Sequence, residues 1–181
     1  MQRRRLLFAA PLMAVPAVAR AQPGFNAPAL TQLKWQPDNG GPPMRLTQLL
    51  GKPLVLTMSY TACRRTCATT MLVLREMQAI FDRTRRDVNV AIVTYDPERD
   101  SPAEWVRYRE TRGLTRASWH FLTGSAADTR RLARYLDLDY WFYDRHVMHD
   151  FRIALFNAHG DWHKELVWDQ PKNLEAFLAD V

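Results

Sequence analysis

Two cysteines four positions apart are the residues of this chain best suited to chemistry. Cys63 and Cys67 are its only cysteines. Four positions are about one helical turn, so at the start of a helix the two sulfurs share a face. Two thiolates there bind a soft ion, copper(I) or zinc, far better than calcium or magnesium. The same pair can form a disulfide, as a redox couple or as a structural bridge, although a bridge across so small a loop adds little stability.

A two-thiolate copper site needs a third ligand, and the chain has five histidines. His120 stands between two aromatic residues in an expected strand, which favours a packed ring. His159 and His163 flank an expected turn and have the pattern of surface residues. His146 and His149 come just before an expected strand, where a loop could bring a ring over the cysteines. Spacing alone does not choose between these last two.

Strands and helices alternate along the part of the chain that must position these residues. Apolar runs predict buried strands, and apolar residues at helical spacing predict helices between them. The expected central strands are residues 54–59, 88–93 and 119–122. Two hairpins are also expected: one pairs residues 33–36 with 44–46, and the other pairs residues 152–156 with 165–168. The expected helices are residues 63–83, 101–113, 125–136 and 171–181. This order, with the cysteines after the first central strand, predicts an α/β fold: a thioredoxin-like three-layer sandwich with a central mixed sheet, helices on both faces and an N-terminal hairpin.

The first 21 residues have the pattern of a signal peptide. A basic start is followed by a short apolar run and by Ala19-Arg20-Ala21, a cleavage motif. The arginine cluster also permits twin-arginine export, and an uncleaved anchor is the alternative, although the run is shorter than the roughly 20 residues a spanning helix needs. We expect a signal peptide at 1–21, a flexible lead at 22–31 and one domain at 32–181. The protein would then be exported to a bacterial periplasm, soluble or anchored to the inner membrane.

The leader also accounts for most of the formal net charge of +6. It holds four arginines and no acid, so the rest of the chain has 21 basic and 19 acidic residues. A net charge of +2 gives no reason to expect nucleic acid as a partner. A membrane would be contacted only through an uncleaved leader.

Three segments in order resemble motifs of the Sco/SenC family, the copper chaperones that help to assemble cytochrome c oxidase. Residues 61–67 resemble the family's Thr-x-Cys-x-x-x-Cys segment, and residues 96–102 are similar to its Asp-Pro-x-Arg-Asp stretch. The spacing from His149 to Gly160 resembles that from the family's metal-binding histidine to a turn glycine, and residues 122–124 look like another family landmark. The resemblance covers roughly residues 34–181.

The resemblance implies that Cys63, Cys67 and His149 bind one copper ion, as Cu(I) or Cu(II). It thereby selects His149 over His146. Asp96 and Asp100 would lie near the site, with a purely structural role beside a well-capped helix as the alternative. The implied partner is the copper domain of cytochrome c oxidase subunit II; another copper chaperone or a thiol reductase are further candidates.

The chain departs from the family pattern beside the proposed ligands. The family usually has proline after each cysteine, whereas Arg64 and Ala68 stand here. The family usually has an acidic residue before the histidine, and this chain has Met148 at that position. A methionine there is expected to be a core residue rather than a ligand. Asp150 follows the histidine instead and is a candidate to orient the ring of His149.

The alternative function is a thiol–disulfide oxidoreductase that reduces partner cysteines before metallation. Cys63 would attack a partner disulfide and Cys67 would resolve the mixed disulfide. Thioredoxin-like reductases carry a cis-proline facing the cysteines, but this chain has no proline between Pro102 and Pro171. This absence favours a metal-binding chaperone, which is not an enzyme, over a reductase. A relative that keeps the fold but has lost the chemistry is a third option.

An aromatic run and an arginine-rich helix complete the features of interest. Residues 140–143 are Tyr-Trp-Phe-Tyr, which favours a core position or a sheet edge, with a docking patch as the alternative. Arg130, Arg131 and Arg134 have the pattern of a solvated helix face, with attraction of an acidic partner surface as the alternative.

Overall fold

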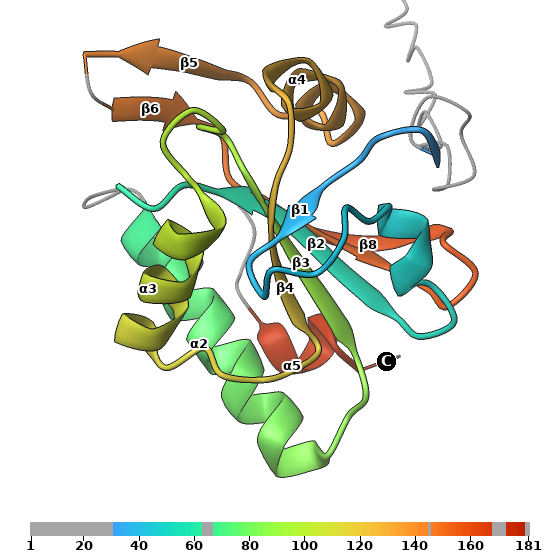
Figure 1. The fold of residues 1–181 in the computed structure, drawn as a ribbon. Helices are drawn as coiled ribbons and strands as arrows, with labels where there is room; N and C mark the ends of the chain where they lie inside the picture. Colours follow the sequence, from blue (N-terminus) through green and yellow to red (C-terminus); the bar gives the residue numbers. More distant parts are fainter. Residues whose placement is uncertain (1–30, 63–66, 145, 168–172, 180–181) are drawn as a thin grey trace, which may run out of the picture.

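Six strands form the central sheet of the computed structural model, in the order β1-β4-β3-β2-β7-β8 (Figure 1). The structure describes residues 31–62, 67–144, 146–167 and 173–179. The expected signal peptide and all but the last residue of the lead fall outside this part of the chain. Within it, no helix is long and apolar enough to cross a membrane.

The three central strands run parallel and the flanking strands run antiparallel to their neighbours. The strands are β1 (Gln36–Pro37), β2 (Leu54–Ser59), β3 (Asn89–Thr94), β4 (Trp119–Thr123), β7 (Arg152–Phe156) and β8 (Trp162–Val167). Every residue of β2 is buried, as its continuous apolar run predicts for a strand covered on both faces. Because the carboxyl ends of parallel strands meet at one edge, Tyr60 after β2 and Tyr95 after β3 are neighbours there.

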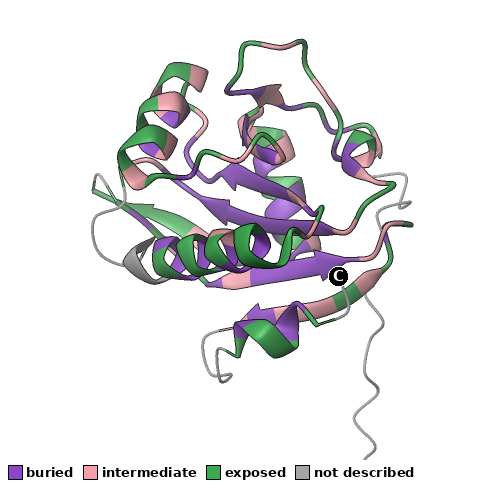
Figure 2. Cartoon of the chain, turned by 90° about the horizontal axis from the view of Figure 1, so that it is seen from below, coloured by how far each residue is buried: buried purple, intermediate pink, exposed green. Residues whose placement is uncertain are grey.

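Helices cover both faces of the sheet, and the buried residues gather along its middle (Figure 2). One face packs against α2 (Cys67–Thr84), α3 (Pro102–Arg112) and α5 (Leu174–Phe177). The other packs against α4 (Ala126–Tyr135) and the 3₁₀ helix η1 (Leu46–Leu49). The predicted three-layer arrangement with a mixed central sheet is confirmed.

The helix boundaries follow from their capping residues. The Ser101 side chain accepts a hydrogen bond from the Glu104 amide at the start of α3, and Gly113 ends the helix with a φ of +67°. Ser125 caps α4 in the same way. These ends are as predicted, because side-chain caps and a left-handed glycine are local signals.

Three elements differ from the prediction. The N-terminal hairpin is reduced to a bridge between Trp35 and Met44, because β1 pairs with β4 instead. Strand β8 begins at Trp162, whose ring packs against Phe156 and extends the pairing. The closing helix is a short α5 capped by Asn173, and residues 168–172 and 180–181 lie outside the described residues.

The segment expected to be a loop before β7 is a second small sheet. Strand β5 (Tyr140–Tyr143) pairs antiparallel with β6 (His146–His149), forming a hairpin beside α4 (Figure 1). His146 and His149 are therefore strand residues, and the loop prediction is wrong. Strand pairing is favoured here because β5 consists of four aromatic residues, which suit extended backbone, and Val147 on β6 is buried.

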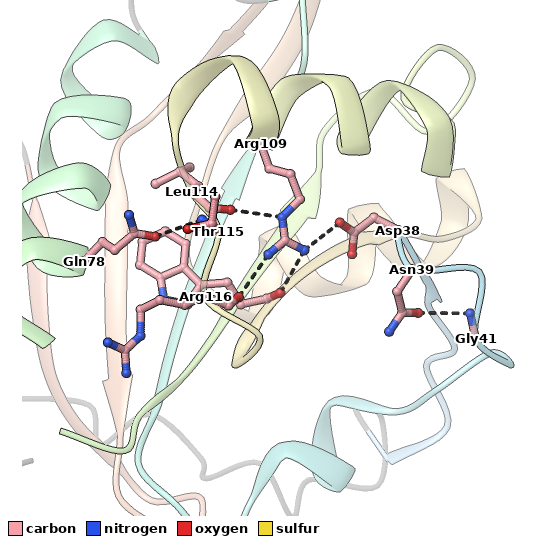
Figure 3. A network of polar contacts seen from close by, with 9 residues as sticks. Asp38, Asn39, Gly41, Gln78, Arg109, Leu114, Thr115 and Arg116 are labelled. Atoms are coloured by element: carbon pink, nitrogen blue, oxygen red, sulfur yellow. Dashed lines mark hydrogen bonds and ion pairs between the residues drawn. The ribbon is translucent and has the colours of Figure 1, made fainter. Parts of the chain in front are cut away.

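Arg109 joins α3 to the loop before β4 and to the N-terminal segment (Figure 3). Its guanidinium donates to the carbonyl oxygens of Leu114, at 3.0 Å, and Arg116, at 2.9 Å. It also donates to the carboxylate of Asp38, at 2.9 Å. Gln78 on α2 holds the same loop from the other side, by donating to the Gly113 carbonyl. One arginine thus satisfies several polar groups of an irregular segment.

Candidate metal centre

The cysteine segment runs from the carboxyl end of β2 to the start of α2. Strand β2 ends at Ser59 and α2 begins at Cys67. Cys63 and the side chain of Cys67 lie outside the described residues. The geometry of the candidate site is therefore given by the residues on either side of this segment and by those that pack against Tyr60 and Thr61.

The ring of His149 lies at the same edge of the sheet as the end of β2. It stacks on Tyr95 with ring centroids 4.6 Å apart and an interplanar angle of 24°. It meets Tyr60 edge-on, with centroids 6.0 Å apart. Tyr60 comes three residues before Cys63, so the fold brings a histidine from β6 to the segment that leads into the cysteines. The two tyrosines hold the ring in one orientation.

A backbone carbonyl fixes the other side of the ring. Nδ1 of His149 is 2.6 Å from the carbonyl oxygen of Asp150. In the tautomer that donates this hydrogen bond, the lone pair is on Nε2, as is usual for metal-ligating histidines oriented by a carbonyl. The Asp150 carboxylate instead accepts from the Asp139 amide at 3.1 Å. The residue expected to orient the ring thus meets it through its main chain.

Through its carboxylate, Asp100 links the ends of β2 and β3 beneath the cysteine segment. It is fully buried, and its carboxylate accepts from the Thr61 amide at 3.1 Å and from the Thr61 hydroxyl at 2.5 Å. The Thr94 hydroxyl donates to its other oxygen at 2.5 Å. Burial raises the pKa of this carboxyl above its usual value, although the hydrogen bonds from Thr61 and Thr94 act in the opposite direction. Thr61 is two residues before Cys63, so Asp100 anchors the approach to the cysteines.

Asp96 is the second buried acid of this edge. Burial raises its pKa, and the charge of Arg99, whose guanidinium lies 3.3 Å from Oδ2, partly offsets that effect. Asp96 and Arg99 line a hollow of about 270 Å³ together with Tyr95, Arg130 and Tyr140. Asp96 therefore faces a surface hollow next to the His149 ring, whereas Asp100 lies beneath the cysteine segment.

The other histidines lie elsewhere. His146 is on the opposite face of β6 from His149, because the two are an odd number of positions apart on one strand. His120 is half-buried on β4 near Asp38 and Arg109, and burial lowers its pKa. His159 and His163 are exposed around the start of β8. The structure therefore separates the two histidines between which spacing alone could not choose.

The described residues on their own form no cluster of three or more His, Cys, Asp or Glu side chains that could hold a metal ion. That search covers neither Cys63 nor the side chain of Cys67. Three residues at this edge were missed from sequence: Tyr60, Tyr95 and Thr94, which hold the ring or the buried acid. A signal for the tyrosines exists, since each directly follows a buried parallel strand.

Solved structures define the class of fold. Copper-bound ScoI of Arabidopsis thaliana matches with a TM-score of 0.70 at 19% identity, covering 82% of this chain and 94% of that one. BsSco, a member of the Sco family of cytochrome c oxidase assembly proteins with an identified disulfide switch, matches with a TM-score of 0.68 at 19% identity, covering 81% and 87%. The protein therefore has the thioredoxin-like fold of the Sco proteins.

Sequence comparison gives the family. The SCO1/SenC family model matches residues 34–180, so the chain belongs to the SCO1/SenC family. A protein of Stutzerimonas stutzeri named "Putative copper-binding protein" is 30% identical over 132 residues, or 68% of this chain. The match spans only 62% of the length of that relative.

Proposed function

We propose that the protein is an exported copper chaperone in which Cys63, Cys67 and His149 bind one copper ion. The observation that carries this proposal is the packing of the His149 ring against Tyr60 and Tyr95, at the segment leading into the cysteines. Two thiolates and one imidazole are a donor set that suits copper. Membership of the SCO1/SenC family and a fold shared with copper-bound ScoI of Arabidopsis thaliana support the same ion.

The chain's own residues prepare the ligands. The Asp150 carbonyl and the Tyr95 ring hold the imidazole in one orientation, which lowers the entropy lost when it binds an ion. Asp100 restrains Thr61 and hence the start of the cysteine segment. Bound copper would leave by ligand exchange, with partner thiolates replacing those of the protein one at a time, and its oxidation state would not change.

The proposed partner is the copper domain of cytochrome c oxidase subunit II. The description of BsSco as belonging to a family of oxidase assembly proteins supports a role in that process. The leader pattern at residues 1–21 supports export to the periplasm, where such a domain is exposed. Another copper chaperone would be the donor of the ion.

Copper titration of the reduced protein tests the ligand set. The wild type should bind one copper ion per chain, and His149→Ala should lower the affinity at least tenfold and change the visible spectrum of the Cu(II) form. His159→Ala, which changes an exposed histidine of the β7–β8 turn, is the matched control and should behave as the wild type. Unchanged affinity and spectrum in His149→Ala would remove this residue from the site.

Thiol–disulfide exchange is the second candidate function. It is favoured by the position of Cys67 as the first residue of α2, because a helix N terminus stabilises a thiolate. Cys63 would attack a partner disulfide and Cys67 would resolve it, so that partner cysteines are reduced before metallation. This function predicts reductase turnover that survives His149→Ala and is lost in Cys63→Ser, whereas the chaperone function predicts a lower copper affinity in both variants.

A further inference from the structure

The β5–β6 hairpin has two faces of different character. In the antiparallel register, Tyr140 lies opposite His149 and Trp141 lies opposite Met148. Because side chains alternate, one face carries Tyr140, Phe142, Val147 and His149, and the other carries Trp141, Tyr143, His146 and Met148. The first face is turned towards the core, since Val147 is buried there and the Tyr140 ring contacts Tyr95, although Phe142 on this face remains 50% exposed. The second face is therefore the outer one.

All four side chains of the outer face are exposed. The exposed fractions are 56% for Trp141, 71% for Tyr143 and 42% for Met148, and His146 is also exposed. The expectation that Met148 is a core residue is wrong. Its neighbours on β6, Val147 and His149, point inward, so the Met148 side chain points to the other face of the strand. Among the described residues, the large exposed apolar side chains gather on this hairpin, with Leu72 on α2 as the exception. Apolar side chains gathered in this way mark functional surfaces.

Two of these side chains are metal donors at a suitable spacing. His146 and Met148 are two positions apart on β6, so their Cα atoms are about 7 Å apart and their side chains leave the strand in the same direction. An imidazole and a flexible thioether can reach one ion across that distance. Trp141 lies directly opposite Met148, with Cβ atoms about 5 Å apart in such pairs, and indole faces attract cations.

The chemistry of these donors selects the ion. A thioether is a soft ligand that favours copper(I), whereas calcium and magnesium need oxygen donors. The outer face carries no carboxylate and no thiolate, so it lacks the anionic ligands that usually bind zinc. One imidazole, one thioether and one indole face therefore fit a soft monovalent cation.

We propose that His146 and Met148, with the indole of Trp141 beside them, form a second copper(I) site on the outer face of the hairpin. This inference rests on the proposed chaperone function and extends it. The outer site would accept copper(I) from a donor and hold it at the surface. Because this face is turned away from His149, the ion would pass by ligand exchange between two molecules of the protein, to cysteine thiolates that bind more tightly than two neutral donors. Copper stays monovalent throughout, so the exchange needs no reductant or oxidant.

The binding test uses the full chain carrying Cys63→Ser, Cys67→Ser and His149→Ala, which lacks every proposed ligand of the main site. Silver(I) is the probe, because it has the ligand preferences of copper(I) and does not change its oxidation state. One ion per chain should bind and shift the NMR signals of the Met148 methyl group and the His146 ring. Adding His146→Ala or Met148→Leu should lower the affinity at least tenfold, and adding His159→Ala should leave it unchanged.

Either of two results would overturn the outer site: no silver binding to the triple variant, or binding that neither His146→Ala nor Met148→Leu weakens. Since the changed residues are exposed, the variants should unfold at the temperature of the parent, which is checked by circular dichroism. Because the main-site ligands are absent, failure here leaves the proposed chaperone function intact. Failure of that function would appear instead in the copper titration of His149→Ala.

The acceptance role is tested separately in the otherwise wild-type chain. Copper(I) is supplied on a weak small-molecule ligand and the loading of the cysteine site is followed by stopped-flow absorbance. The double variant His146→Ala/Met148→Leu should load at least threefold more slowly and reach the same final copper affinity. An unchanged loading rate would contradict the acceptance role.

Discussion

Asp38 and Asp100 are both buried acids, but the structure treats their charges differently. The Asp38 carboxylate is neutralised by Arg109, whose guanidinium lies 2.9 Å away (Figure 3). Asp100 is fully buried and accepts hydrogen bonds from two threonine hydroxyls and one amide. Among the described residues, no cation lies within ion-pair distance of Asp100. One acid is paired with a charge and the other is not.

The difference separates an acid that ties two segments together from an acid that lies beside the proposed copper ligands. A buried acid paired with an arginine fixes the position of two segments. The attraction between the two charges offsets the cost of removing them from water. A buried acid held by neutral donors keeps a carboxyl whose ionisation is unfavourable, and such groups concentrate at functional sites. Asp100 lies beneath the residues that lead into Cys63, whereas Asp38 directly follows the edge strand β1 and its amide donates to the Phe121 carbonyl on β4.

Breaking the Asp38–Arg109 pair should have the largest effect on stability. Arg109→Met leaves the Asp38 charge buried and two carbonyl oxygens without their donor, so the free energy of unfolding should fall by about 3–5 kcal/mol. Urea denaturation measures this loss. Arg107→Met, which removes an exposed pair with Glu104, is the control and should change the value by less than about 1 kcal/mol. A similar small change in Arg109→Met would show that the buried pair is not structural.

Removing the Asp100 carboxylate should have an intermediate effect on stability and also weaken copper binding. Asp100→Ala takes the acceptor from Thr61 and Thr94, which should lower the free energy of unfolding by about 2 kcal/mol. The start of the cysteine segment should then be less restrained and the copper affinity lower, with part of both losses restored in Asp100→Asn. Thermal unfolding and copper titration are the measurements, with Asp87→Ala at an exposed ion pair as control. Unchanged copper affinity in a folded Asp100→Ala protein would restrict this acid to a structural role.

The hydroxyl of Thr123, which joins β4 to α3 and to the loop before it, should contribute less to the free energy of unfolding. Thr123 Oγ1 donates to the Asp100 carbonyl at 2.5 Å and accepts from the Trp105 indole at 3.1 Å. Thr123→Val keeps the shape and removes both bonds, so the free energy of unfolding should fall by about 1 kcal/mol. The exposed Thr115→Val is the control for the loss of a threonine hydroxyl. A loss as large as that of Asp100→Ala would mean that Thr123, and not the carboxylate, holds this region together.

The smallest expected effect is a pH dependence of stability that comes from Asp100. The pKa of Asp100 is raised in the folded protein, so the folded state binds this proton more tightly than the unfolded chain. The stability gained by protonation is complete below the unfolded pKa and is lost as the pH rises through the folded pKa. The unfolding free energy of the wild type, relative to that of Asp100→Asn, should therefore increase as the pH falls from neutral towards the ordinary pKa of an aspartate. A difference that is constant with pH would contradict the raised pKa.

Local patterns were enough to predict most of the central domain. The apolar runs of β2 and β3 and the capping residues Ser101, Gly113 and Ser125 each act within a few positions, so the sequence displays them directly. The β5–β6 hairpin was missed because β5 is an unbroken aromatic run and β6 has a histidine at each end, so neither shows the alternation of apolar and polar residues that indicates a half-buried strand. Its histidines were read as loop residues, and Met148 was placed in the core, for that reason.

The sequence by itself determined the donor types of the candidate site, the family resemblance and the order of the elements, because these depend on residue identity and local spacing. The tertiary structure alone decided that His149 and not His146 lies beside Tyr60, that the Asp150 main chain meets the ring, and that Asp100 binds Thr61. These contacts join segments far apart in the chain, or depend on which face of a strand is turned inward. Both are fixed by packing, which no short stretch of sequence encodes.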